Sequence, residues 1–160
     1  MKARALRKLA AGLIIASVAL GNGQQEKRWV LLPESEVKFV KAWYSRQGPN
    51  RVTGTWQPTP AEIGDLENDL LQIRDLSKKS RLESQQIEHP ERYFRQYLGI
   101  IQGQNRHIYL SAFCGVNEGL PPAYWRNRLF MILDGGNCVW QAVYDVKSST
   151  FVELRVNGLG

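Results

Sequence analysis

The sequence predicts an α+β fold in which one long amphipathic helix packs on an antiparallel β-meander of about five strands. Two observations carry this prediction. Between residues 60 and 79, apolar residues recur at spacings of three and four, as on one face of a helix. After residue 92 the apolar period changes to two, and glycine-containing turns separate the segments. A helix that precedes a run of strands is typical of an α+β layer arrangement.

The N-terminal segment has the pattern of a secretory signal peptide. Four cations precede an apolar run of about a dozen residues, and small residues follow at Gly21 and Gly23. Spanning a bilayer as a helix takes roughly twenty residues, so an uncleaved anchor is the weaker alternative. We expect residues 1–23 to be removed on export, with the cut after Gly21 or Gly23. Residues 24–160 would then form a single α+β domain, periplasmic or secreted, with no permanent membrane span.

Removal of this segment changes what the net charge implies. The formal charge of the whole chain is +6, and residues 1–23 hold four of the cations and no acids. The mature chain would therefore carry a net charge of +2. A near-neutral domain does not have the electrostatic footprint of a nucleic-acid-binding protein, so we expect no nucleic-acid partner.

Only short elements are predicted before the long helix. Trp29 to Leu32 form an apolar stretch that Pro33 closes. Between Glu34 and Tyr44 the apolar residues fit helical spacing, although alternation would also fit a strand, and we favour a short helix. Residues 47–58, with two prolines and two glycines, read as turns and loop.

The clearest local pattern begins at Thr59. Thr59 is a good N-cap, Pro60 suits the first helical position, and Glu62 completes a capping box. One apolar stripe follows, formed by Ile63, Leu66, Leu70 and Ile73, and three cations lie at the end of the pattern. We therefore expect one helix over Pro60–Lys79, lying against a sheet.

Five strands are predicted after the helix, over residues 93–102, 106–113, 129–133, 138–144 and 150–156. The first two are joined by a three-residue connection, Gly103 to Asn105. Asp134 to Asn137 and Lys147 to Ser149 supply the other two turns, the first with glycines that adopt positive φ.

The three-residue connection sets which side chains share a face of the first hairpin. With it, Arg95, Tyr97, His107 and Tyr109 lie on the face away from the helix. Tyr and Arg are frequent binding anchors, so these four are candidate ligand-binding residues. The alternative is an ordinary solvated sheet face, stabilised by aromatic and charged cross-strand pairs.

Trp125 and Arg126, just after two prolines, form a second candidate binding site. The alternative there is that Trp125 fills the edge of the core while the arginines around it are solvated. Among the acids, Asp134 reads as a turn residue beside two glycines.

The chain holds two cysteines, Cys114 and Cys138, both in the part that would be exported. We expect a disulfide between them, because the compartment outside the cytoplasm is oxidising. Closing a loop of this length stabilises a fold by about 3 kcal/mol in the chain-entropy view. Two buried free thiols are the alternative.

No motif predicts catalysis, a metal or a cofactor. His89 and His107 are the only histidines, and neither an HExxH pair nor a CxxC pair occurs. Serine-hydrolase, Walker and dinucleotide-binding glycine patterns are also missing. We expect no catalytic residues, no metal site and no cofactor.

The mature chain resembles a family of small uncharacterised exported proteins of Gram-negative bacteria. The resemblance covers most of the mature chain and rests on residues 95–100, 108–113, 122–126, 134–136 with Trp140, and 151–158; residues 56–59 and Leu66-Glu67 fit it too. Its motifs are turn and strand residues. It implies a periplasmic address and one domain, and it carries no site residues.

These observations favour a non-catalytic binding or interaction module of the cell envelope. Its partner would be a protein, a peptide or an envelope component, bound by the open sheet face or by residues 121–128. A small hydrolase, or an accessory of one, that uses Asp134 or Glu118 is the alternative. A structural subunit of an envelope assembly is a third, and it predicts a flat apolar patch.

Overall fold

The fold class is confirmed as α+β in a computed structural model that describes residues 27–44, 51–115 and 123–158. The predicted signal peptide lies outside these residues. The sheet has six strands: β1 (Trp29–Leu31), β2 (Val52–Thr55), β3 (Phe94–Gln102), β4 (Asn105–Phe113), β5 (Val139–Asp145) and β6 (Thr150–Val156). Strand order is β1-β3-β4-β5-β6, and β2 pairs with the second half of β3. All pairs are antiparallel except β1 with β3.

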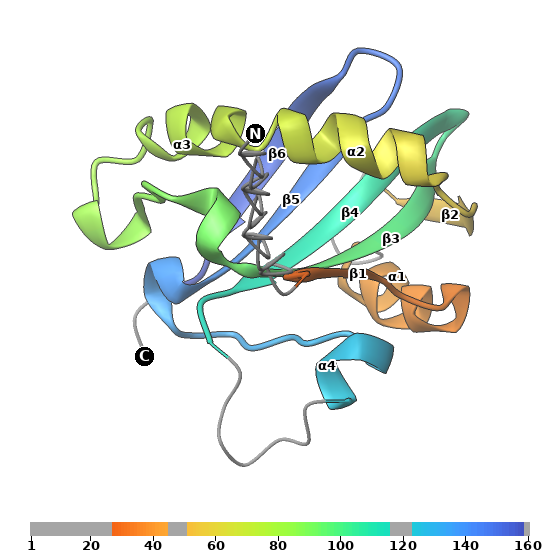
Figure 1. Cartoon of the computed structure of the whole chain (residues 1–160), viewed down its shortest axis with the longest axis horizontal. Coiled ribbons are helices and arrows are strands. Elements are labelled where there is room, and N and C mark those ends of the chain that lie inside the picture. The colour runs from red at the N-terminus through yellow and green to blue at the C-terminus, as the bar shows by residue number, and fades with distance from the viewer. Residues whose placement is uncertain (1–26, 45–50, 116–122, 159–160) are drawn as a thin grey trace, which may run out of the picture.

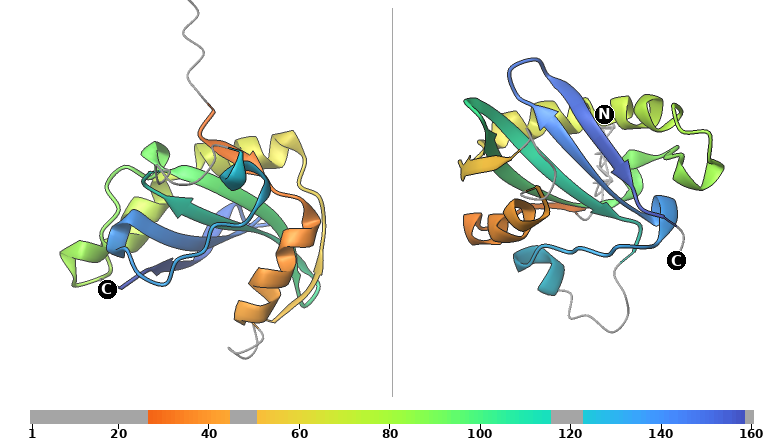
Figure 2. Two further views of the ribbon diagram at one scale, coloured as in Figure 1. Left: turned by 90° about the horizontal axis from the view of Figure 1, so that it is seen from below. Right: turned by 180° about the vertical axis from the view of Figure 1, so that it is seen from behind.

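Helices cover the sheet on both faces (Figures 1 and 2). α2 (Pro60–Asn68) and α3 (Leu71–Ser77) lie on one face, which we call the helix face. α1 (Val37–Tyr44), α4 (Tyr124–Asn127) and residues 128–134, which we call the strap, lie on the other, the strap face. Within the described residues there are also short 3₁₀ turns, η1 (Glu34–Glu36), η3 (Glu83–Gln85), η4 (Pro90–Arg92) and η5 (Gly136–Cys138). The prediction of an open sheet face is therefore wrong.

The predicted single helix over residues 60–79 is two shorter helices. Its start is as expected: Thr59 accepts from the Glu62 amide, and the Glu62 side chain accepts from the Thr59 amide. The helix then tightens at Asp69 and Leu70, where Gln72 N–H donates to the Asp69 carbonyl three residues back. The break lets one apolar stripe remain buried along a twisted sheet, since Ile63, Leu66, Leu70 and Ile73 are all at most 3% exposed.

A tyrosine of β5 holds the break between these helices. The Tyr144 hydroxyl donates to the Asp69 carboxylate at 2.6 Å. Burial, together with this hydrogen bond, raises the pKa of Tyr144 to about 12. The unfolded chain releases this proton near pH 10, so the stabilisation is complete below pH 10 and is lost as the pH rises toward 12.

Replacing Tyr144 by phenylalanine should therefore flatten the alkaline loss of stability. Above pH 10, the free energy of unfolding of the wild type should fall by about 1.4 kcal/mol per pH unit more steeply than that of Tyr144→Phe. Urea unfolding at pH 9, 10, 11 and 11.5 measures this difference. Parallel curves for the two proteins would contradict the assignment.

The hairpin of β3 and β4 turns through two residues, one fewer than predicted. Gln102 pairs with Asn105, and Gly103 adopts φ +63° at the first turn position. A register shift of one residue moves every side chain of one strand to the opposite face. Arg95 and Tyr97 consequently lie on the helix face, whereas His107 and Tyr109 lie on the strap face.

The predicted strand over residues 129–133 belongs to the strap and pairs with no strand. Side chains of the sheet hold its backbone instead. The Gln96 amide donates to the carbonyls of Trp125 and Arg128 and accepts from Phe130 N–H at 2.7 Å, and Ser111 Oγ donates to the Phe130 carbonyl at 2.9 Å. The strap therefore closes the face by side-chain hydrogen bonds rather than by a β-ladder.

The two sheet edges differ. Along β3, the outer side is covered by β1 at its start and by β2 at its end. Gly99 of β3 lets the chain that follows β2 pass close by, because a Cβ at this position would lie 2.0 Å from the Trp56 carbonyl oxygen. At the opposite edge, no described residue pairs with the outer side of β6.

The predicted disulfide is confirmed between Cys114 and Cys138, whose Cα atoms are 4.9 Å apart. It joins the end of β4 to the start of β5, and Cys114 N–H also donates to the Cys138 carbonyl at 2.9 Å. A bridge of this kind persists in an oxidising compartment.

Candidate functional site

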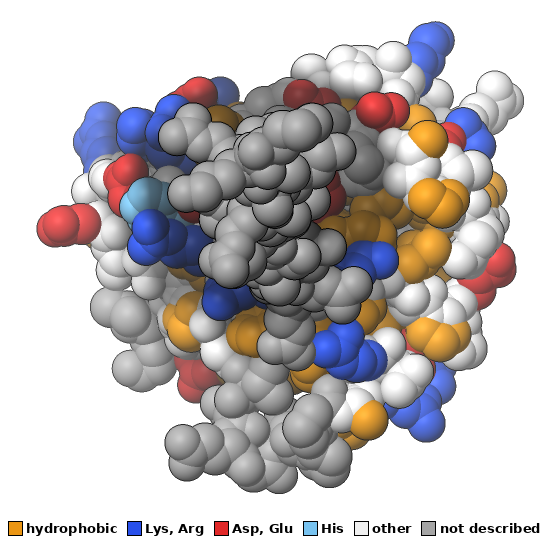
Figure 3. Space-filling view, in the orientation of Figure 1, with side chains coloured by type: hydrophobic (Ala, Val, Ile, Leu, Met, Phe, Trp, Pro, Cys, Tyr) orange, Lys and Arg blue, Asp and Glu red, His pale blue; other side chains and the backbone are white. Residues whose placement is uncertain are grey.

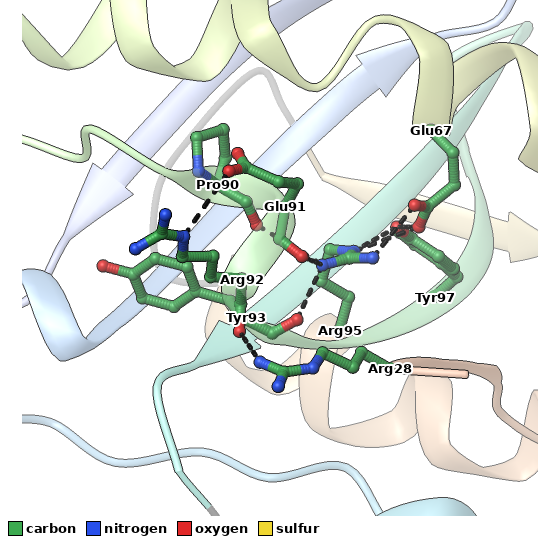
Figure 4. A network of polar contacts seen from close by, with 8 residues as sticks. All are labelled: Arg28, Glu67, Pro90, Glu91, Arg92, Tyr93, Arg95 and Tyr97. Carbon is green, nitrogen blue, oxygen red and sulfur yellow. Dashed lines mark hydrogen bonds and ion pairs between the residues drawn. The ribbon is translucent and has the colours of Figure 1, made fainter. Parts of the chain in front are cut away.

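Arg95 and Tyr97, the first two predicted binding residues, belong to a buried polar network on the helix face (Figure 4). The Arg95 guanidinium binds the two carboxylate oxygens of Glu67 at 3.0 and 2.9 Å. The Tyr97 hydroxyl donates to the same carboxylate, and Arg95 Nε lies 3.2 Å from that hydroxyl. Burial raises the pKa of Tyr97 well above its usual value, and the Glu67 charge raises it further.

The remaining donors of Arg95 hold the chain that leads into β3. Its Nη1 donates to the carbonyls of Glu91 at 2.8 Å and Tyr93 at 2.6 Å. Figure 4 shows the guanidinium between Glu67 on α2 and the carbonyls of Glu91 in η4 and of Tyr93, which follows it. The Arg95 side chain is only 5% exposed and is occupied by these internal contacts, so it presents little surface to a ligand.

His107 and Tyr109 lie on the strap face, apart from the first pair. Tyr109 is 2% exposed and packs edge-on against Tyr44 of α1, with ring centroids 6.4 Å apart. His107 is 8% exposed and is the cross-strand partner of Asp145. The four predicted sheet residues therefore do not form one surface, because the two-residue turn separates them.

Trp125 and Arg126 divide between core and surface. Trp125 is 3% exposed and packs edge-on against Phe94 and Phe113, as the alternative interpretation expected. The guanidinium of Arg126 lies 4.7 Å from the centre of the Trp125 ring. Residues 116–122, which include the predicted loop prolines and Glu118, lie outside the described part of the chain.

Asp134 ends the strap. Its side chain is exposed, and its carbonyl accepts from the Asn157 amide at 2.9 Å.

Within residues 27–44, 51–115 and 123–158, no three His, Cys, Asp or Glu side chains are grouped as a metal site requires. In the same ranges, no helix is long and apolar enough to cross a membrane.

A cleft of about 280 Å³ opens beside the disulfide. Its lining comprises Gln86, Glu88, His89, Arg92, Tyr93, Cys114 and Asn137. His89 Nδ1 lies 3.3 Å from a Glu91 oxygen, and Arg92 lies close to the same carboxylate. Its lining holds one acid, Glu88, and one arginine, Arg92, so its charges favour neither an anion nor a cation.

The outer edge of β6 offers a more specific arrangement. Asn157 N–H donates to the Val139 carbonyl at 3.2 Å, so Asn157 directs its backbone groups toward β5. In an antiparallel ladder this direction alternates from one residue to the next. Val156 and Leu154 therefore direct their N–H and C=O groups away from the sheet, where a further strand would bind.

A side chain of α3 already binds the start of this edge as a strand would. Gln72 accepts from Phe151 N–H at 3.1 Å and donates to the Ser149 carbonyl at 3.2 Å. An amide that both accepts and donates takes the place of one peptide group of an added strand. The edge beyond it, at Leu154 and Val156, is not occupied in this way by any described residue.

Two hollows line this edge on the helix face. The larger, of about 440 Å³, lies between β6 and the end of α3 and is lined by Leu76, Ser77, Lys79, Ser80, Gln85, Leu154 and Val156. The smaller, of about 290 Å³, is lined by Gln72, Asp75, Leu76, Lys79, Thr150 and Phe151. Leu76 and Lys79 line both, so the hollows form one groove along β6, which we call the edge groove.

Comparison with known proteins adds no relative to this picture. A scan against models of protein families, a search of curated proteins and a search of solved structures each found no match. The resemblance to small exported proteins therefore stays a prediction, and the candidate site rests on the geometry of the chain itself.

Proposed function

We propose that the protein is an exported, non-catalytic binding module of the cell envelope that holds an extended segment of a partner protein along β6. The segment would add a strand to the sheet, with main-chain hydrogen bonds supplying affinity and side chains in the edge groove supplying specificity. This replaces the predicted sheet-face site, whose residues are buried.

Export is supported by two independent features. The first is the basic and apolar pattern of residues 1–23, which ends in small residues. The second is the disulfide, since bridges are rare in proteins that stay in a reducing cytosol.

The observation that carries the binding proposal is the direction of the Leu154 and Val156 backbone groups beside the edge groove. Proteins often protect a free edge with bulges and charged side chains, and β6 has both a register shift before Glu153 and the Glu153–Arg155 ion pair. A protected edge needs no adjoining groove, however. The groove beside Leu154 and Val156 favours a bound segment.

Peptide display tests this function. The protein is purified from the periplasm of expressing cells, where its chain should begin at Asn22 or Gln24 by mass spectrometry. A library of random twelve-residue peptides is then panned against it and, in parallel, against Leu154→Pro. Proline removes one outward N–H and leaves the β5 ladder intact, so peptides enriched on the wild type should lose at least about tenfold in affinity.

Leu154→Val is the matched control, because it keeps the N–H and should keep binding. Amide NMR should show the enriched peptides perturbing Leu154 and Val156, and N-methylation of alternate peptide residues should abolish binding. Enrichment that is equal on the wild type and Leu154→Pro, or no enrichment at all, would overturn the proposal and leave β6 as a protected edge.

A further inference from the structure

Resting on the proposed function, we infer that the bound segment is acidic. It places an aliphatic side chain in the edge groove and, two residues away on the same face, a carboxylate against Lys79. Residues two apart in a strand point to the same side, so one face of an added strand would supply both groups.

The aliphatic part follows from the walls of the larger hollow. Leu76 of α3 and the two β6 residues Leu154 and Val156 are half-buried there and present apolar surface. All three side chains pack against the helix-face core and remain only partly buried. An aliphatic side chain of the added strand would bury the surface that they leave exposed.

The acidic part follows from the charges that line the groove. Among the described residues that line the larger hollow, Lys79 alone is charged. The smaller hollow adds Asp75, whose carboxylate lies 3.5 Å from Arg74 Nε.

Two more exposed cations, Lys78 and Arg81, follow α3, and the next exposed acid along the chain is Glu83. Figure 3 shows Lys and Arg side chains gathered on the side of the molecule that α3 and the chain after it occupy. This excess of positive charge favours a carboxylate on the incoming strand.

A second copy of the chain fits the edge less well. Self-pairing of β6 about Leu154 would place Glu153 opposite Arg155, which suits the charges. However, α3 and the segment that follows it extend past β6 on the helix face (Figures 1 and 2). Two molecules related by a twofold axis would require the same space for these segments, whereas a single extended segment would not.

The composition of the enriched peptides tests this inference. On the wild type, they should share an aliphatic residue and an Asp or Glu at positions i and i+2. Panning on Lys79→Glu should replace the acid by Lys or Arg. For one synthetic peptide from the wild-type set, Glu→Gln should weaken binding about fivefold in fluorescence polarisation at low salt, as exposed ion pairs do.

Lys78→Glu is the matched control, since Lys78 is equally exposed but lines neither hollow, and it should leave the acidic preference unchanged. Edge-binding peptides without an acid, or an acid preference that Lys79→Glu does not reverse, would overturn this inference while the proposed function stands. Failure of every peptide to perturb Leu154 and Val156 would overturn both.

Discussion

Replacing Arg95 by methionine should lower the free energy of unfolding by about 3–5 kcal/mol. The substitution keeps an apolar stem but leaves the Glu67 carboxylate without the cation that binds both of its oxygens. It also removes the donor to the Glu91 and Tyr93 carbonyls. The Arg95 side chain is only 5% exposed, so water cannot readily reach the groups that it leaves, and a buried polar group without a partner costs about 1–3 kcal/mol.

Arg106→Met is the control for this prediction. Arg106 forms a comparable contact, 2.9 Å from a Glu62 oxygen, but its side chain is 55% exposed. The Glu62 and Glu67 side chains are about equally exposed, at 19% and 21%, but water can take the place of the exposed Arg106 guanidinium, so the expected cost is about 1 kcal/mol or less. Chemical denaturation of both variants measures the contrast. Equal losses would show that the burial of the Arg95 network does not determine its contribution.

The hairpin of β3 and β4 shows where sequence reasoning reaches its limit. Both strands were recognised from their alternating pattern, and both have the expected bounds within one residue. Gly103 fits a two-residue or a three-residue turn equally well, because either turn uses a glycine with positive φ. Since both faces of this sheet are buried, alternation could not decide the register, and the candidate site built on that register failed.

The strap and the split helix depended on tertiary contacts that no local pattern encodes. Residues 129–133 are as apolar as a strand, yet their backbone binds Gln96 and Ser111. The helix breaks where Tyr144 meets Asp69. In contrast, the capping box at Thr59 and the disulfide were predictable, because each depends on residue type and spacing or compartment alone.

The edge groove was visible in the sequence only in parts. The last strand was predicted over residues 150–156, and cations were expected at the end of the helix, which was predicted to close at Lys79. What joins them is the position of β6 at the edge of the sheet, next to α3. Strand order is not determined by the local period, so the groove could not be derived from the sequence.

Replacing Gln96 by leucine should lower the free energy of unfolding by about 3 kcal/mol. Gln96 is fully buried, and its amide is the partner of three backbone groups: the carbonyl of Trp125 in α4, and the carbonyl of Arg128 and the N–H of Phe130 in the strap. Leucine fills similar space but satisfies none of them. Each buried polar group left without a partner costs about 1–3 kcal/mol.

Gln141→Leu is the matched control. Gln141 lies on the same cross-strand row, since Ser111 pairs with both Gln96 and Gln141, and it is also nearly buried. None of the strap bonds described above involves it, so its loss should cost less than about 1 kcal/mol.

Amide hydrogen exchange separates a local effect of Gln96→Leu from a global one. Exchange of the Phe130 amide should accelerate more than that of the β4 and β5 amides, because the strap is released before the sheet opens. Unchanged protection of Phe130 would mean that apolar packing of the strap, rather than the Gln96 amide, closes this face of the sheet. The edge groove lies on the opposite face, so peptide binding at β6 should survive the substitution.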